Sequence, residues 1–168
     1  QEEAVNLAKK NIKYSKLIFK QGSIFKPWKT VNIKFDIIIS DVSSISEPVA
    51  KKSPWYDGIT SDCDLDGIKN LKLIIKDLNK FMNKDGFFII PIISLCNLEK
   101  LYSILKENFI DISYSEKVNW PLPDFFKKNI TDFQSLIDLN NINVEYKFGT
   151  YLAFTSIATC SKLKYVDR

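Results

Sequence analysis

The most informative absence in this chain is histidine, of which its 168 residues contain none. Without imidazole the chain lacks the commonest general base, the Ser-His and Cys-His nucleophile pairs and the ligand of most zinc sites. Its three cysteines, Cys63, Cys96 and Cys160, stand far apart and without the spacing of a metal site. We therefore expect no metal, and the odd, scattered cysteines predict reduced thiols in a cytoplasmic protein.

Arginine and long apolar runs are nearly absent as well. Arg168 is the only arginine, so the net charge of +4 comes from evenly spread lysines. Bidentate recognition of phosphate or guanine favours arginine, which argues for a solvated lysine surface and against a nucleic-acid face. The longest apolar stretch, from Phe87 to Cys96, is broken by Pro91 and is too short to span a bilayer. We expect neither nucleic acid nor membrane as a partner.

Two apolar runs predict the fold class. Between Lys34 and Asp41 an unbroken β-branched run predicts a central strand of a parallel sheet, buried on both faces. A second run, Gly86–Ile93, follows an amphipathic helical pattern at 68–82, so the three form a βαβ unit of a single α/β domain over residues 1–168. Because ligands of open α/β sheets bind at the carboxyl ends of the strands, we expect the chemistry at Ser40 and Asp41.

The other patterns fill in the element order. Two alternating runs near the end predict an antiparallel strand pair, and they flank an apolar and aromatic insertion at 120–148 with its own short helix. The remaining predictions are a helix at 4–12, a short strand at 17–19, a long polar loop at 45–66, a helix at 98–109, and the paired strands at 110–118 and 151–158.

Several short motifs follow one another in a recognisable order. A helix with Ala4, Ala8 and Asn11 in the pattern Ala-x-x-x-Ala-x-x-Asn comes first, followed by Gly22-Ser23-Ile24-Phe25, the run from Phe35 to Ser44, and the stretches at 49–58 and 64–67. Together they resemble the class I S-adenosylmethionine-dependent methyltransferases, and most closely the release-factor glutamine methyltransferases and their small-domain relatives. In that family the second and third motifs read Gly-Asp-Leu-Phe and Phe-Asp-Leu-Ile-Val-Ser-Asn-Pro-Pro-Tyr.

The resemblance implies a Rossmann-like, mostly parallel sheet with an antiparallel strand pair at its C-terminal end. It also implies S-adenosylmethionine as cofactor, and the positions that match the family's cofactor contacts are Gln1, Gly22, Ser23, Ile24, Asp41 and Val42. The family's glycine-rich loop would lie upstream of Gln1, and none of the five glycines here forms a Gly-x-Gly cluster. We therefore expect a C-terminal piece of a methyltransferase-like domain. A missing N-terminal segment or a partner chain would complete its sheet, and the isolated chain would be incomplete and inactive.

The family's Asn-Pro-Pro-Tyr appears here as Asp41-Val42-Ser43-Ser44. Asp41 keeps an acceptor but loses the amide donor, and Ser44 lacks the stacking ring. The resemblance then implies methyl transfer to a small-molecule or peptide acceptor other than a glutamine amide. Asp41 would be the catalytic residue, and the substrate contacts would be Ser43, Ser44, Trp55, Tyr56 and Trp120.

Each of these interpretations has an alternative. Asp41 could only cap the turn after its strand, and Trp120 could belong to a rigid packed turn. The chain could also be a catalytically degenerate methyltransferase-like subunit that binds a protein. Residues 62–67 match the first half of a calcium loop, but the twelfth position is Leu73 rather than glutamate. We expect those acids to cap the helix that starts near Ile68.

Overall fold

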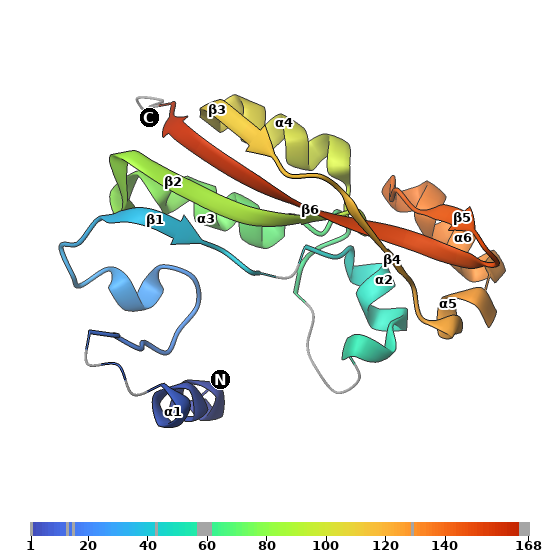
Figure 1. The fold of residues 1–168 in the computed structure, drawn as a ribbon, viewed down its shortest axis with the longest axis horizontal. Helices are drawn as coiled ribbons and strands as arrows, with labels where there is room; N and C mark the ends of the chain where they lie inside the picture. Colours follow the sequence, from blue (N-terminus) through green and yellow to red (C-terminus); the bar gives the residue numbers. More distant parts are fainter. Residues whose placement is uncertain are drawn as a thin grey trace.

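A computed structural model describes residues 2–12, 14, 16–42, 44–56, 62–128 and 130–164, without the side chains of Lys127, Ile130 and Asp132 (Figure 1). The elements run in the order α1 (Glu2–Asn11), η1 (Lys26–Trp28), β1 (Phe35–Ile39), α2 (Glu47–Lys52), η2 (Pro54–Tyr56), α3 (Lys69–Phe81), β2 (Met82–Ile93), α4 (Leu98–Asn108), β3 (Phe109–Tyr114), β4 (Val118–Pro121), α5 (Asp124–Lys128), α6 (Ile130–Asn140), β5 (Glu145–Lys147) and β6 (Thr150–Leu163). In this part of the chain no helix is long and apolar enough to cross a membrane.

The strands form one six-stranded sheet, and the α/β class is confirmed. Its central order is β1-β2-β6-β3, and β4 and β5 also pair with β6. Among the described strands only β1 and β2 pair in parallel, whereas β6 pairs antiparallel with all four of its neighbours. The expected antiparallel pair is present, but the expectation of a mostly parallel sheet is wrong for these residues.

The sheet is mostly antiparallel because of β6, a strand of 14 residues that begins directly after a hairpin turn. Phe148 and Gly149 have φ angles of 53° and 74°, and two consecutive positive φ angles are what a two-residue hairpin turn requires. The hairpin reverses β5 into β6, which then runs back between β2 and β3. One long strand thus makes most of the sheet antiparallel.

Helices α3 and α4 lie on the same face of the sheet, behind it in Figure 1. Their apolar positions recur with the helical period, as the sequence predicts, and Leu71, Ile74 and Leu78 of α3 are buried. They meet the buried residues of β2 and β6 in the main core, which contains Phe88, Ile90, Ile92, Phe109, Ala158 and Cys160. This face is therefore the interior of the molecule.

Strand β1 departs from the prediction of a central strand buried on both faces. It pairs only with β2 among the described strands, so it forms an edge of the sheet. Ile37 and Ile39 are 57% and 71% exposed, whereas Ile38 packs against the main core. An apolar run indicates that a strand prefers burial on both faces. It does not say whether other residues of this chain cover both of them.

Some local predictions also change. Residues 17–19 form no strand, and the stretch expected as a loop at 45–66 contains α2. Helix α1 is present as predicted, with Glu2 and Glu3 in its first turn, but it buries no residue. The insertion at 120–148 contains α5, α6 and β5, whose apolar residues join α2 in a second core cluster around Phe126 and Phe133.

All three cysteines are buried free thiols, as expected for reduced residues. Burial raises the pKa of Cys96 and of Cys160 from 9.0 to about 12, because the thiolate would lose its hydration. A pKa that is higher in the folded than in the unfolded chain adds stability below pH 9 that is lost as the pH rises towards 12.

We expect Cys96 and Cys160 to resist a thiol-specific disulfide reagent at pH 8 until urea unfolds the chain, because the reactive species is the thiolate. We also expect the free energy of unfolding to fall above pH 9. Peptide mapping of the labelled cysteines and urea titrations between pH 7 and 11 would measure both. Labelling of either cysteine as fast in the folded chain as in urea would contradict the prediction.

Candidate functional site

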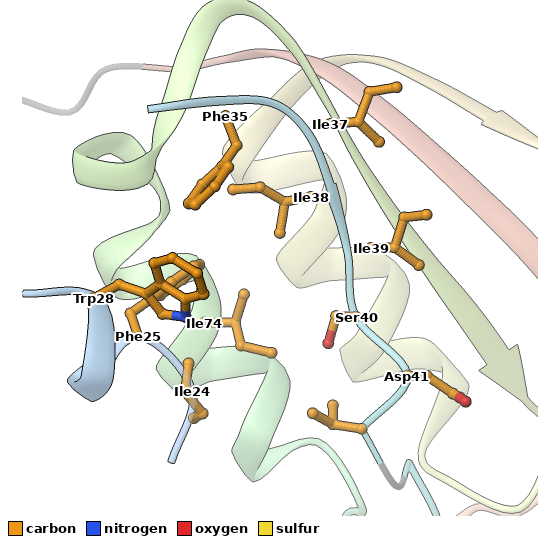
Figure 2. A pocket seen from close by; sticks show the side chains of 11 residues that line it. Ile24, Phe25, Trp28, Phe35, Ile37, Ile38, Ile39, Ser40, Asp41 and Ile74 are labelled. Atoms are coloured by element: carbon orange, nitrogen blue, oxygen red, sulfur yellow. The ribbon is translucent and has the colours of Figure 1, made fainter. Parts of the chain in front are cut away.

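A pocket of about 410 Å³ lies along β1 and at its carboxyl end (Figure 2). It brings together three of the residues predicted to contact a cofactor, namely Ile24, Asp41 and Val42. The other lining residues are Phe25, Trp28, Phe35, Ile37, Ile38, Ile39, Ser40 and Ile74. Residues from the loop before β1, from β1 itself and from α3 thus build one site.

The loop wall of the pocket is held firmly by aromatic packing. The Phe25 ring stacks on Phe81 of α3 with centroids 4.4 Å apart, and Trp28 meets Phe35 edge to face at 5.5 Å. The Lys20 ammonium lies 4.9 Å from the centroid of the Trp28 ring and donates a hydrogen bond of 2.9 Å to the Pro27 carbonyl. These contacts fix the wall that faces β1.

Ile24 adopts a φ of 51°, which is rare for a β-branched residue. Such strained backbone persists only where the surrounding structure enforces it, and it clusters at ligand sites. Here Ile24 lines the pocket, opposite Ser40 (Figure 2).

Successive side chains of a strand point to opposite faces of the sheet, and those at the end of β1 do so as well. Figure 2 shows Ile38 and Ser40 pointing towards Ile24 and Ile74, whereas Ile39 and Asp41 point the other way. The Ser40 backbone N–H donates to the Ile89 carbonyl at 3.0 Å, which holds this end of β1 on β2. Its hydroxyl is buried and has no hydrogen-bond partner among the described residues. Ser40 thus offers an unused polar group to the pocket.

Asp41 lies at the rim of the pocket, and its side chain is exposed. No described residue makes a hydrogen bond or ion pair with its carboxylate, and the turn that it could cap includes Ser43, which lies outside the described residues. A carboxylate here can accept a hydrogen bond from a ligand or take a proton from one.

Gly22 and Ser23 do not line the pocket, although they were predicted to contact a cofactor. A Cβ on Gly22 would lie 2.2 Å from Cγ of Pro27, so glycine is required by the close approach of the chain. The Ser23 carbonyl accepts a bond of 3.0 Å from the Lys26 N–H. Both residues shape the turn that leads into the loop wall. Gln1 and Ser43, also predicted, lie outside the described residues.

The predicted substrate residues divide between two places. Ser44 is buried and its hydroxyl donates to the Val42 carbonyl at 3.4 Å, so it belongs to the turn after β1. Trp55 and Trp120 do come together, with ring centroids 5.8 Å apart, and Tyr56 packs against the same second core cluster. These three residues therefore lie in one aromatic region of the structure, but none of them lines the pocket at β1.

The aromatic group also has a structural role. The Trp120 indole N–H donates to Thr155 Oγ1 on β6 at 3.0 Å, and Trp55 lies 6.0 Å from the Phe126 ring of α5. Trp55 remains 39% exposed. Trp120 is only partly buried, and Trp55 is therefore the more accessible of the two tryptophans to an outside molecule.

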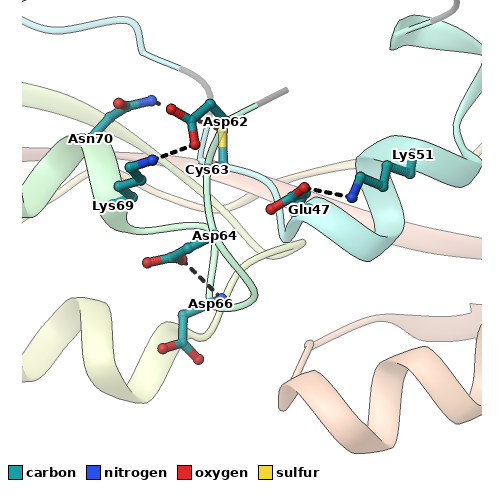
Figure 3. A network of polar contacts seen from close by, with 8 residues as sticks. All are labelled: Glu47, Lys51, Asp62, Cys63, Asp64, Asp66, Lys69 and Asn70. Carbon is teal, nitrogen blue, oxygen red and sulfur yellow. Dashed lines mark hydrogen bonds and ion pairs between the residues drawn. The ribbon is translucent and has the colours of Figure 1, made fainter. Parts of the chain in front are cut away.

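The acids at 62–66 form no metal site (Figure 3). Asp62 pairs with Lys69, and Asp66 pairs with Lys100 at 2.8 Å. Asp64 Oδ1 accepts from the Asp66 N–H at 3.0 Å, so it closes a turn. No cluster of three possible ligands occurs among the described residues.

The expectation that these acids cap α3 is wrong. Asp64 bonds within its own turn and Asp66 pairs with Lys100 on α4, while the Lys69 N–H at the start of α3 donates to the Cys63 carbonyl at 3.3 Å. The loop is thereby tied to both α3 and α4.

Sequence reasoning expected chemistry at Ser40, but it did not identify Phe25, Trp28 and Ile74 as contributors to the pocket. Ile74 was placed correctly on the buried face of α3, but nothing in its spacing said which loop it would meet. The signal that could have found Trp28 is the group of aromatic residues at 25, 28 and 35, which is dense for a loop.

Comparison with known proteins gives no further guide to the site. No protein-family model matches the chain, and no curated protein matches its sequence.

Proposed function

We propose that this chain serves S-adenosylmethionine-dependent methyl transfer to a small-molecule or peptide acceptor other than a glutamine amide. The observation that carries the proposal is the pocket at the end of β1, where Ile24, Asp41 and Val42 meet. These three positions correspond to cofactor contacts in the family that the motifs resemble. The position of β6, antiparallel between β2 and β3, agrees with the antiparallel ending that the resemblance implies.

The lining of the pocket suits one end of that cofactor. A volume of about 410 Å³ is within the usual range of ligand pockets, and the walls are aromatic and aliphatic. The Ser40 hydroxyl, buried and unpaired among the described residues, supplies a polar group that a flat hydrogen-bonding ring such as adenine can use. No lining residue is basic, so the cofactor's carboxylate finds no partner here. The described residues fit the adenosine end alone.

When bound, the cofactor supplies a methyl group on a sulfonium for displacement by a nucleophile. The chain's own contribution is to position the reactants, which can supply much of the rate of such a reaction. Asp41 would accept a hydrogen bond or a proton from a hydroxyl or amine of the acceptor. Since a carboxylate cannot donate, it serves a glutamine amide less well than asparagine would.

Binding of S-adenosylmethionine to the chain tests the proposal. We expect millimolar cofactor to shift the methyl NMR signals of Ile24, Ile38 and Ile74, which line the pocket, and to leave that of Ile157 on the opposite face unchanged. Weak affinity is expected because only the adenosine end is held. Absence of shifts in the three pocket isoleucines would contradict the proposal.

Replacement of Asp41 by alanine separates the roles of the carboxylate. If Asp41 serves the acceptor, Asp41→Ala leaves the cofactor-induced shifts and their concentration dependence within about twofold of the parent chain, as does the matched control Asp85→Ala on the exposed part of β2. A large loss of cofactor affinity in Asp41→Ala alone would assign the carboxylate to the cofactor.

A second candidate function is a methyltransferase-like subunit that lost catalysis and binds a protein. The exposed isoleucines of β1 favour it, because an apolar surface of this kind is typical of interaction sites. Lack of any cofactor-induced shift, in a chain that is folded by circular dichroism, would favour this function over methyl transfer.

A further inference from the structure

Two buried hydroxyls, those of Ser40 and Ser46, have no hydrogen-bond partner in the described part of the chain. Buried polar groups of folded proteins are nearly always paired. Ser94, which is also buried, follows that rule, because its Oγ accepts from the Phe154 N–H at 2.9 Å. A buried hydroxyl without a partner lowers the stability of the folded chain. Each of the two exceptions therefore calls for a reason.

Ser40 and Ser46 differ in what surrounds them. Ser40 follows β1 and lines the pocket, and Figure 2 shows its side chain pointing towards Ile24 and Ile74. Ser46 stands at the N-cap of α2, where its side chain makes no capping bond, and it does not line the pocket. Of the two hydroxyls, only that of Ser40 can therefore reach a molecule bound in the pocket.

The surroundings of Ser40 select the kind of partner. The side chains of Ile24, Ile38 and Ile74 in the lining are aliphatic, whereas a buried water molecule needs roughly three polar partners. Asp41 is the one charged residue of the lining, so a phosphate group meets no positive charge there. An uncharged flat ring fits better, because its faces can contact the aliphatic wall while its edge bonds to the hydroxyl.

The opposite wall of the pocket carries a second cost to stability. Ile24 lies across the pocket from Ser40 (Figure 2), and its φ of 51° is strained for a β-branched residue. Natural proteins keep strained backbone and other local conflicts mainly at functional sites. Both walls therefore have a feature that the free chain does not need and that a ligand can use.

We propose that Ser40 is a ligand-binding residue of this pocket, whose hydroxyl finds its hydrogen-bond partner on the edge of the adenine ring of a bound nucleoside. A hydroxyl both donates and accepts, so it can serve a ring nitrogen or the amino group. The identity of the ring rests on the proposed function, whereas the unpaired state of the hydroxyl does not. Adenosine, which has no methyl donor and no amino-acid tail, is then expected to bind the pocket and to depend on Ser40.

Methyl NMR titrations with adenosine and with S-adenosylmethionine test this role, with Ile24, Ile38 and Ile74 as reporters. We expect Ser40→Ala to weaken the binding of both ligands about three- to tenfold, as the loss of one hydrogen bond does. Ser40→Cys nearly keeps the size of the side chain but bonds weakly, so it should lose about as much. Ser46→Ala removes the other unpaired hydroxyl and should leave both affinities within about twofold of the parent chain.

Urea titrations distinguish ligand binding from structural support. Because neither hydroxyl has a partner among the described residues, Ser40→Ala and Ser46→Ala should unfold at urea midpoints equal to or above that of the parent chain. A lower midpoint in Ser40→Ala would make Ser40 a structural residue and overturn the proposal. Parent-like affinities in Ser40→Ala, or in Ser40→Cys, would overturn it as well.

The two ligands separate this role from methyl transfer. Binding of adenosine but not of S-adenosylmethionine would overturn methyl transfer and leave the role of Ser40 intact. Binding of S-adenosylmethionine but not of adenosine would overturn the role of Ser40 alone. Binding of neither ligand to the folded parent chain would overturn both.

Discussion

Replacing Phe88 with alanine is expected to lower the free energy of unfolding by about 3–5 kcal/mol, because it removes a large, fully buried side chain and leaves a cavity. Phe88 lies on β2 between β1 and β6, in register with Ile38 and Cys160. Its ring is 0% exposed and stacks on Phe109 at 5.9 Å between centroids. The ring belongs to the main core, where its buried neighbours come from α3, α4, β3 and β6.

The neighbouring residue provides a matched control. Phe87 has the same side chain on the same strand but points to the face opposite α3 and α4, where it is 45% exposed. Phe87→Ala is expected to cost less than about 1 kcal/mol, because nearly half of the side chain is exposed and its removal opens no enclosed cavity. Urea titrations followed by circular dichroism would measure both. Equal losses would mean that the face opposite α3 and α4 is covered in solution.

Hydrophobic periodicity predicted the helices because it reports directly which side of an element is buried. The pattern at 68–82 identified α3, and Leu71, Ile74 and Leu78 are buried as expected, whereas Met82 already belongs to β2. The pattern at 98–109 identified α4 in the same way. Both helices pack against a sheet face that is formed by residues of this chain. Their apolar positions are therefore buried, as the sequence pattern predicts.

The same reasoning was wrong about the surroundings of β1. Its apolar run predicts burial on both faces, yet Ile37 and Ile39 are exposed. The apolar pattern shows that β1 is suited to burial on both faces. The described residues cover only one of these faces, and Ile37 and Ile39 are therefore exposed on the other. The parallel character of the sheet failed for a related reason, since the length of β6 and its hairpin decide it.

The candidate site was predictable where a topological rule applied. Ser40 and Asp41 follow β1 directly, and both line a pocket where the rule that ligands bind at carboxyl ends predicts one. Contacts between distant segments could not be predicted. Trp55 and Trp120 contact each other and do not line the pocket near Asp41. The packing of η2 against β4 and α5 brings them together, and no local sequence pattern predicts that packing.

The second large effect is expected at Gly67, where the chain leaves the acidic turn and enters α3. Gly67 has a φ of 74°, a conformation that side chains with a Cβ adopt only with strain. A Cβ here would lie 2.7 Å from the Ser46 nitrogen and 2.8 Å from the Ile45 carbonyl carbon. Both of these are backbone atoms, and they cannot move aside as the end of a flexible side chain can.

The segment that Gly67 contacts is held in place from the other side as well. The Ser46 N–H donates to the Leu95 carbonyl at 2.8 Å, and the Asn97 N–H donates to the Asp66 carbonyl at 2.9 Å. Gly67 therefore lies where the chain after β1, the start of α3 and the turn after β2 meet. A side chain there must break one of these bonds or push the segment that follows Asp41 away from the sheet.

Gly67→Val is accordingly expected to lower the free energy of unfolding by at least about 3 kcal/mol, from left-handed strain and backbone displacement together. Leu65→Ala, in the same turn but 67% exposed, should change it by less than about 0.5 kcal/mol. Urea titrations measure the loss, and backbone amide NMR shifts at 41–46 report the displacement. A loss in Gly67→Val as small as that in Leu65→Ala would show that the loop after β1 is not packed against α3, and the pocket at Asp41 would then lack a fixed base.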